Sequence, residues 1–170
     1  DSDTVTAINV ATNAVVWEAP AGRHPSGIAQ GSDETLWVVC RDSDEVLVLD
    51  PGTGAEVARL AVGHGRRPVS IVSTPNRQSM LVATEGDGQL RRFTVATRTA
   101  NGVLSLGPMP RAIAVTANGN RALVTRFLSG EHSGSIYDVS LSGSMSLTRT
   151  ISLRRDFSTD GSASGRGVPN

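Results

Sequence analysis

Basic residues gather beside three prolines of this chain, and they are its most suggestive chemistry. Arg23 and His24 precede Pro25 in "GRHP" (22–25), and Arg66 and Arg67 precede Pro68 in "GRRP" (65–68). Guanidinium groups present several N–H donors in a planar fork that suits carboxylate and phosphate groups. Together they would form a basic ring that holds a small anion, a carboxylate or an acidic partner. The candidate binding residues are Arg23, His24, Arg41, Arg66, Arg67, Arg111 and Arg126, with Met109 at the corresponding place in "GPMP" (107–110).

Acidic residues follow nearby apolar runs and supply the competing interpretation. If both sets of loops share one face, the arginines could pair with these acids or remain solvated, because surface ion pairs are common and contribute little. Both interpretations stay open on the sequence alone. The acidic residues are Asp42, Asp44, Glu85, Asp87 and Glu131.

Metal binding and catalysis find little support in the residue types. His24, His64 and His132 come from different loops, and no two have a ligand spacing typical of zinc. Asp156, Ser158 and Asp160 resemble the start of a calcium loop, but Gly167 stands where a bidentate Glu is needed, which favours a surface insertion. No serine lies in a G-x-S-x-G context with an assignable His and Asp. We therefore expect no catalytic residues, no metal and no cofactor in this segment. Enzymatic activity is left open, although the residues favour its absence from this segment.

Composition excludes several classes of function. The 16 Lys and Arg residues balance the 16 Asp and Glu residues, so no net field attracts nucleic acid or an anionic membrane, and nucleic-acid binding is disfavoured. No apolar run approaches the roughly 20 residues of a membrane-spanning helix. Cys40 is the only cysteine, and within "LWVVC" it is expected to be a small buried side chain.

The loops that carry these residues recur at an almost fixed interval. The G-x-x-P loop begins at 22, 65 and 107, and an isoleucine follows each proline by three residues, at Ile28, Ile71 and Ile113. Each unit then contains a polar turn, a strongly apolar strand and two further strands, with "LWVVC" (36–40), "MLVAT" (80–84) and "ALVTR" (122–126) as the apolar ones. We expect the three isoleucines to be buried at equivalent places on the innermost strands.

Four short strands about every 42 residues are typical of a β-propeller blade. The sequence therefore predicts an all-β fold of four-stranded antiparallel blades, with one partial domain over 1–170 and about three and a half blades in an open arc. Because the chain opens at Asp1 in the middle of a repeat, we expect a segment of a larger ring. The expected divisions are 1–21 (the last two strands of a blade), 22–64, 65–106 and 107–153 (blades), and 154–170 (a loop or the start of a further blade).

Over about residues 1–153 the chain resembles the YVTN-type β-propeller repeat proteins. Their tetrad is matched by 37–40, 81–84 and 123–126, although its terminal Asn is absent in all three units, and their V-S-V-I-D strand is matched best by 46–50. The resemblance implies an extracytoplasmic, often bacterial protein at the cell surface or in the periplasm. It also implies larger relatives that join such a propeller to c-type haem modules, although no C-x-x-C-H occurs in this segment.

Two hypotheses of function follow. The first is a binding or interaction scaffold that presents its loop face to a protein or a small anionic ligand. The second is the propeller portion of a larger redox enzyme, cytochrome-like or peroxidase-like, whose catalytic or haem module lies outside the segment. In either case exposed strand edges predict association with the remaining blades of a parent propeller or self-association.

Overall fold

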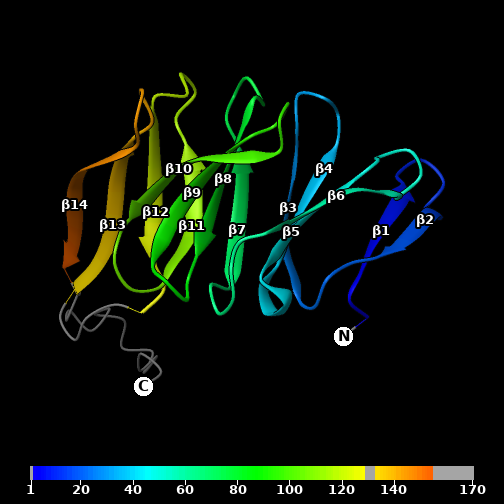
Figure 1. The fold of residues 1–170 in the computed structure, drawn as a ribbon, viewed down its shortest axis with the longest axis horizontal. Helices are drawn as coiled ribbons and strands as arrows, with labels where there is room; N and C mark the ends of the chain where they lie inside the picture. The colour runs from blue at the N-terminus through cyan, green and yellow to red at the C-terminus, as the bar shows by residue number, and fades with distance from the viewer. Residues whose placement is uncertain (1, 129–132, 155–170) are drawn as a thin grey trace, which may run out of the picture.

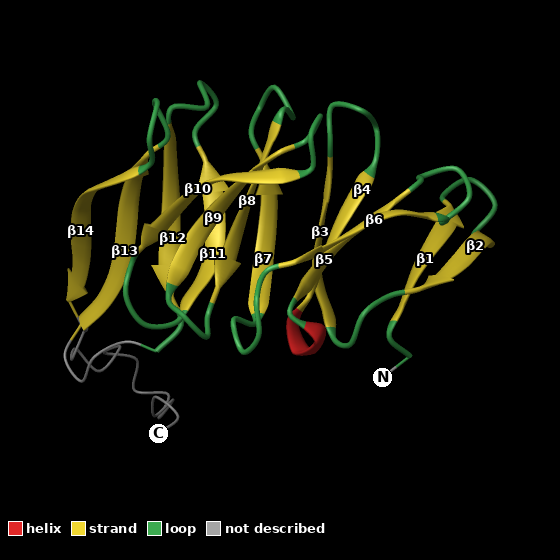
Figure 2. Ribbon diagram, viewed as in Figure 1, coloured by secondary structure: helices red, strands yellow, loops and turns green. Residues whose placement is uncertain are grey.

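The computed structural model describes residues 2–128 and 133–154, which form 14 β-strands and one short 3-10 turn, η1 (Arg41–Ser43) (Figure 2). The strands make one two-stranded sheet and three four-stranded sheets, all antiparallel. Among the described residues no helix is long and apolar enough to cross a bilayer. The half-blade is β1 (Thr4–Asn9) and β2 (Ala14–Pro20); blade 1 is β3 (Pro25–Gln30), β4 (Leu36–Cys40), β5 (Glu45–Leu49) and β6 (Glu56–Ala61); blade 2 is β7 (Pro68–Ser73), β8 (Ser79–Thr84), β9 (Gln89–Thr94) and β10 (Thr99–Ser105); blade 3 is β11 (Pro110–Val115), β12 (Arg121–Arg126), β13 (Ser133–Ser140) and β14 (Ser146–Arg154).

Each four-stranded sheet is a meander in which consecutive strands pair, as a propeller blade requires. The sheets stand side by side in chain order, from β1–β2 at one end of the molecule to β14 at the other (Figure 1). The two end sheets do not meet, so the described residues form an open arc. The predicted fold class, three and a half β-propeller blades, is confirmed.

Residues at equivalent positions of the sequence repeat pair in the same way between the first and second strands of each blade. Ile28 pairs with Val38, Ile71 with Val82, and Ile113 with Val124. In each blade the pairing between the third and the outermost strand shifts register once. In blade 1 the shift between β5 and β6 falls between Val48 and Leu49 of β5. A bulge of this kind increases the local twist. The three blades therefore share one strand register.

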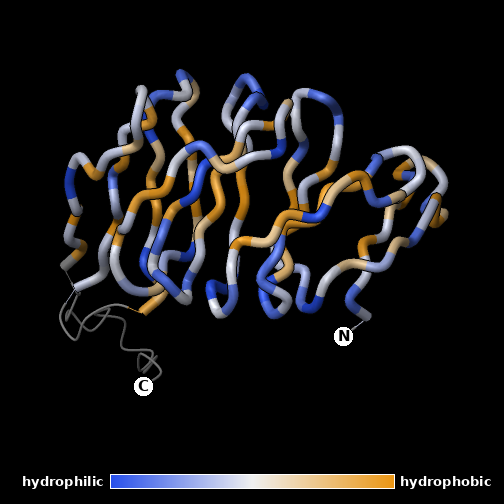
Figure 3. The backbone as a smooth tube through the Cα atoms, viewed as in Figure 1, coloured by the Kyte–Doolittle hydropathy of each residue, from blue (hydrophilic) through white to orange (hydrophobic). Residues whose placement is uncertain are grey.

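Apolar side chains fill the spaces between neighbouring blades. One cluster joins Trp37, Val39 and Val46 of blade 1 to Val82 and Phe93 of blade 2. A second joins blade 2 to blade 3, and a third joins the half-blade to blade 1. The apolar strand centres and polar loops are visible along the chain trace (Figure 3). Burial between stacked sheets is the main favourable contribution to such a fold.

The three isoleucines are equivalent in register but not in burial. Ile71 is 8% exposed and packs in the cluster between blades 1 and 2. Ile113 is half-buried, and Ile28 is 52% exposed. The expectation that all three are buried is therefore wrong for Ile28. The reason is that its face of blade 1 meets only β1 and β2, which contribute no inner strand to cover it.

The G-x-x-P loops take a strained backbone turn between blades. His24, Arg67 and Met109, the residues immediately before the prolines, all adopt positive φ, at 56°, 50° and 55°. Gly22 does not need a positive φ, but a Cβ there would lie 2.7 Å from the Cβ of Cys40. Gly65 does have a positive φ of 74°. The glycine is thus required for space in one loop and for conformation in another.

Candidate functional site

The two kinds of charged loop lie together at one end of the blades, and the face they form is called the loop face below. The amide of Arg41 donates to the carbonyl of His24 over 3.0 Å, and the amide of Glu85 donates to the carbonyl of Arg67, also over 3.0 Å. The Phe127 amide makes the corresponding bond, 2.8 Å long, to Met109. These backbone bonds place the candidate arginines and the candidate acids on the same surface.

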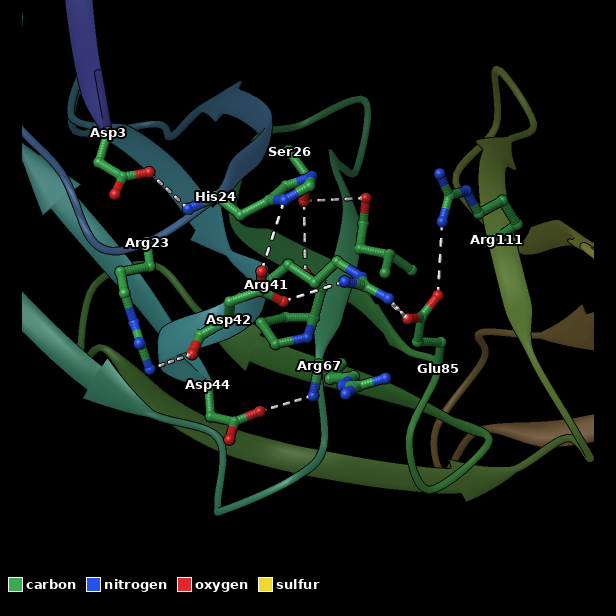
Figure 4. A network of polar contacts seen from close by, with 12 residues as sticks. Asp3, Arg23, His24, Ser26, Arg41, Asp42, Asp44, Arg67, Glu85 and Arg111 are labelled. Atoms are coloured by element: carbon green, nitrogen blue, oxygen red, sulfur yellow. Dashed lines mark hydrogen bonds and ion pairs between the residues drawn. The ribbon is translucent and has the colours of Figure 1, made fainter. Parts of the chain in front are cut away.

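An ion-pair network spans the blades at the centre of the loop face (Figure 4). The Nε atom of Arg41 lies 2.8 Å from Oε1 of Glu85, which Nη2 of Arg41 also contacts. Nη1 of Arg111 lies 3.4 Å from Oε2 of Glu85. The Glu85 side chain is only 5% exposed, and its hydrogen bond raises the pKa of Arg41. One buried carboxylate thus holds an arginine from blade 1 and another from blade 3.

Asp42 engages the basic residues of the first G-x-x-P loop. Its carbonyl accepts a 3.0 Å hydrogen bond from Nη2 of Arg23, and its carboxylate lies 3.5 Å from Nδ1 of His24. The same carboxylate lies 2.9 Å from Nη1 of Arg41. With Arg111, four of the seven residues of the predicted basic ring therefore contact Asp42 or Glu85.

Two aspartates connect consecutive blades by accepting hydrogen bonds from backbone amides of the next G-x-x-P loop. Asp3 accepts a 2.9 Å hydrogen bond from the His24 amide, and Asp44 accepts bonds of 2.7 and 2.6 Å from the amides of Arg67 and Gly65. Burial opposes ionisation of Asp44, but these amide bonds outweigh it, and the pKa of Asp44 is lowered. Asp44 is thus a positioning residue that fixes the loop carrying Arg67.

The loop after β8 also holds an aspartate, Asp87, that contacts an arginine of the G-x-x-P loop at 65–68. The Asp87 carboxylate lies 3.4 Å from Nε of Arg66 and 2.9 Å from Nη2 of Arg91, and it accepts a hydrogen bond from Thr84. Arg67 is exposed and makes no ion pair within residues 2–128 and 133–154. Arg126 is half-buried, and in the same residues its Nε atom has no hydrogen-bond partner.

Sequence reasoning missed two apolar residues of the loop face, Phe127 and Leu128. Each is 55% exposed, and the guanidinium carbon of Arg111 lies 4.8 Å from the centre of the Phe127 ring. This is the geometry of a cation–π contact. A signal was present in the repeat, because Phe127 follows β12 where Arg41 and Glu85 follow β4 and β8. Blade 3 thus carries an exposed aromatic residue at a position that is charged in the other two blades.

The structure offers no metal centre in the part of the chain that it describes, where no group of three His, Cys, Asp or Glu residues converges. His24 and His64 face separate aspartates, Asp42 and Asp44. His132, Glu131 and the calcium-loop candidates Asp156, Ser158 and Asp160 lie outside the described residues. Cys40 is fully buried, as expected, and burial raises the pKa of its thiol to about 11, which makes it unreactive.

Comparisons with known proteins agree on the fold. No family model matches the sequence, and no curated protein matches it. Hydrazine synthase of Kuenenia stuttgartiensis is similar in structure, with a TM-score of 0.78 and 19% identity over 89% of this chain and 44% of that one. Virginiamycin B lyase of Staphylococcus aureus has a TM-score of 0.73 and 15% identity over 91% of this chain and 50% of that one.

A putative 6-phosphogluconolactonase of Bacteroides uniformis has a TM-score of 0.70 and 11% identity over 86% of this chain and 50% of that one. The chain thus spans about half the length of these proteins. At such identities the likeness establishes the β-propeller fold alone, because one fold hosts many unrelated functions.

Proposed function

We propose that this chain belongs to an extracytoplasmic YVTN-type propeller protein whose loop face binds a partner protein. The repeated G-x-x-P loops and the tetrad strands, together with the confirmed blade architecture, support the YVTN assignment. The extracytoplasmic location rests on that resemblance. Fractionation of the native organism, with the chain detected by antibody, tests the location: recovery with cytoplasmic markers would refute it.

One observation carries the binding function: the exposed pair Phe127–Leu128 beside Arg111 on the loop face. Aromatic residues and arginine dominate the energetics of protein interfaces, especially where they cluster. Arg111 is 47% exposed and already shares Glu85 with Arg41, so it can add a contact to an acidic side chain of the partner. The expected partner surface presents an apolar side chain with a carboxylate next to it.

The internal ion pairs weaken the proposal of a small anionic ligand at the same face. Arg23, Arg41, Arg66 and Arg111 all contact carboxylates or carbonyl oxygens of the protein. A free anion would have to compete with those groups. Arg67 is the exposed arginine that a partner carboxylate reaches most easily.

Selection from a random peptide library displayed on phage tests the binding function. The wild-type chain should enrich peptides that combine an acidic with an apolar residue, and synthetic copies should bind in titrations. The double variant F127S/L128S should lose this binding. The control is V10S, which removes a 92% exposed valine from the turn between β1 and β2, at the opposite end of the strands from the loop face. Equal binding by all three proteins, or no enrichment by the wild type, would refute the proposal.

A second candidate function is the propeller portion of a larger redox enzyme. It rests on the resemblance to YVTN-type proteins, whose larger relatives join such a propeller to haem modules; hydrazine synthase shares the propeller fold with this chain at a TM-score of 0.78. The chemistry would then belong to a haem module of the longer parent chain. Mass spectrometry and an absorbance spectrum of the full-length natural product separate the two: a Soret band supports this candidate, and a colourless product refutes it.

A further inference from the structure

A polar pocket lies between blades 2 and 3 at the end of the strands opposite the loop face. Its volume is about 310 Å3. The turn 74–79 of blade 2 and the turn 118–120 of blade 3 form two of its sides, and Arg92 of β9 forms a third. Neither the fold nor the proposed partner binding uses this pocket. Its size is at the lower end of the range for small-molecule sites, which suits one sugar-sized molecule.

The pocket exists because two positions of the repeat change between blades. In blade 2, Arg77 reaches back to blade 1, where Nη1 lies 3.1 Å from Oε1 of Gln30 and Nη2 lies 3.3 Å from Oε1 of Glu34. Its carbonyl also accepts a 2.9 Å hydrogen bond from the Ser32 amide. These contacts bridge the gap between blades 1 and 2. Gly119 stands at the corresponding turn position in blade 3, also with positive φ, and has no side chain to bridge the next gap.

The second change places a positive charge in the pocket wall. The third strand of blade 1 has the buried Val48 opposite Trp37, whereas that of blade 2 has Arg92 opposite Leu81. Arg92 donates to the carbonyls of Leu141 and Gly143 over 3.1 and 2.8 Å, and to Asn101 over 3.2 Å. Those bonds use three of its five N–H groups.

The remaining lining residues are neutral, and most of them carry polar side chains. In the described part of the chain, no carboxylate lines the pocket. The Oδ1 atom of Asn118 is occupied by the turn, because it accepts bonds of 2.7 Å from Thr116 and 3.1 Å from the Asn120 amide. The Asn118 amide nitrogen donates no hydrogen bond to the described protein groups and is exposed to solvent. The pocket therefore combines one cation with side-chain N–H donors and hydroxyl groups.

We propose that this pocket binds a small hydroxylated carboxylate of the size of a hexuronic acid. The ligand carboxylate would lie against the free N–H groups of Arg92 and the Asn118 amide, since charge-assisted hydrogen bonds are the stronger ones. The ligand hydroxyls would contact Thr74, Gln78, Ser79 and Asn120. This inference concerns a different surface from the loop face and stands independently of partner binding.

The variant N118D tests the site without disturbing the turn. Blade 1 has Asp33 in the corresponding turn, where its Oδ1 accepts hydrogen bonds from the amide and the hydroxyl of Thr35, so an aspartate is compatible with this local fold. In N118D the donor becomes a second carboxylate oxygen that repels the ligand. The matched control is N9D: Asn9 caps the β1–β2 turn as Asp50 caps the next, away from the pocket.

Binding of sodium D-glucuronate is measured by isothermal titration calorimetry at constant ionic strength, with the methyl ester of glucuronic acid as an uncharged comparison. We expect saturable binding by the wild type and by N9D, and a loss of roughly 10- to 100-fold in affinity for N118D and for the ester, as expected for one hydrogen bond to a charged group. Thermal melting confirms that each variant is folded. No binding by the wild type, or equal affinity of N118D and the wild type, would overturn the proposal.

Discussion

Truncation of equivalent isoleucines provides a quantitative test of how the blades stabilise one another. Ile71 and Ile28 occupy the same place on β7 and β3, but Ile71 is 8% exposed and Ile28 is 52% exposed. Substitution by Ala removes three carbon atoms, each worth about 0.8 kcal/mol when buried. I71A loses this transfer energy and leaves a cavity beside Trp37, so the expected destabilisation is about 3 kcal/mol, within the range of roughly 2–5 kcal/mol for such changes.

I28A should cost about 1 kcal/mol or less, since half of the side chain already faces water and no closed cavity forms. I113A should lie between the two, because Ile113 is half-buried. Urea unfolding monitored by tryptophan fluorescence gives the three free energies, with an unchanged m-value as the check that the variants share one denatured state. Equal losses for I71A and I28A would refute the view that packing against the preceding blade sets the contribution of this position.

Three further predictions concern single groups and the ends of the arc. Cys40, with its thiol pKa raised to about 11, should react with Ellman's reagent at pH 8 only after unfolding. Hydrogen bonds from Arg121, and then from Arg149, lower the pKa of Asp138, although burial acts against them. The ionised carboxylate therefore stabilises the fold at neutral pH, and this stabilisation is lost as the pH falls below about 4. D138N should therefore unfold at lower urea concentration than the wild type at pH 7 and lose less stability on acidification. Analytical ultracentrifugation should show concentration-dependent association that I8S/I28S reduces, because Ile8 and Ile28 are 57% and 52% exposed.

The blades could be predicted from the sequence because each residue of the repeat fixes the backbone only in its own neighbourhood. Proline after a sharp turn, an isoleucine three residues later and an apolar strand after a polar turn recur at each unit, and each fixes the local backbone. The burial of Ile28 could not be predicted from the repeat, because it depends on which strands of the neighbouring blade pack against it. The same pattern of residues gives a buried isoleucine in blade 2 and an exposed one in blade 1.

The candidate site was only partly predictable for a related reason. The loops that would share a face followed from propeller topology, and the structure places them together. The pairing of Arg41 with Glu85 could not be predicted, because it joins side chains of two blades whose relative placement the repeat does not specify. The pocket beside Arg92 was missed because a glycine in a turn is normally interpreted as a conformational device rather than as an absent side chain.

Departures from the repeat, rather than the repeat itself, distinguish the two proposed sites. The position after the second strand holds a cation in blade 1, Arg41, and an anion in blade 2, Glu85, which neutralise each other, whereas blade 3 holds the exposed Phe127. At the opposite end of the strands, Arg77 bridges the gap between blades 1 and 2. Gly119 of blade 3 has no side chain to bridge the equivalent gap between blades 2 and 3, which stays open. The two proposed sites therefore lie at opposite ends of blade 3, separated by well-packed strands. Substitutions at such distant positions act independently, so F127S/L128S should leave glucuronate affinity unchanged and N118D should leave peptide binding unchanged.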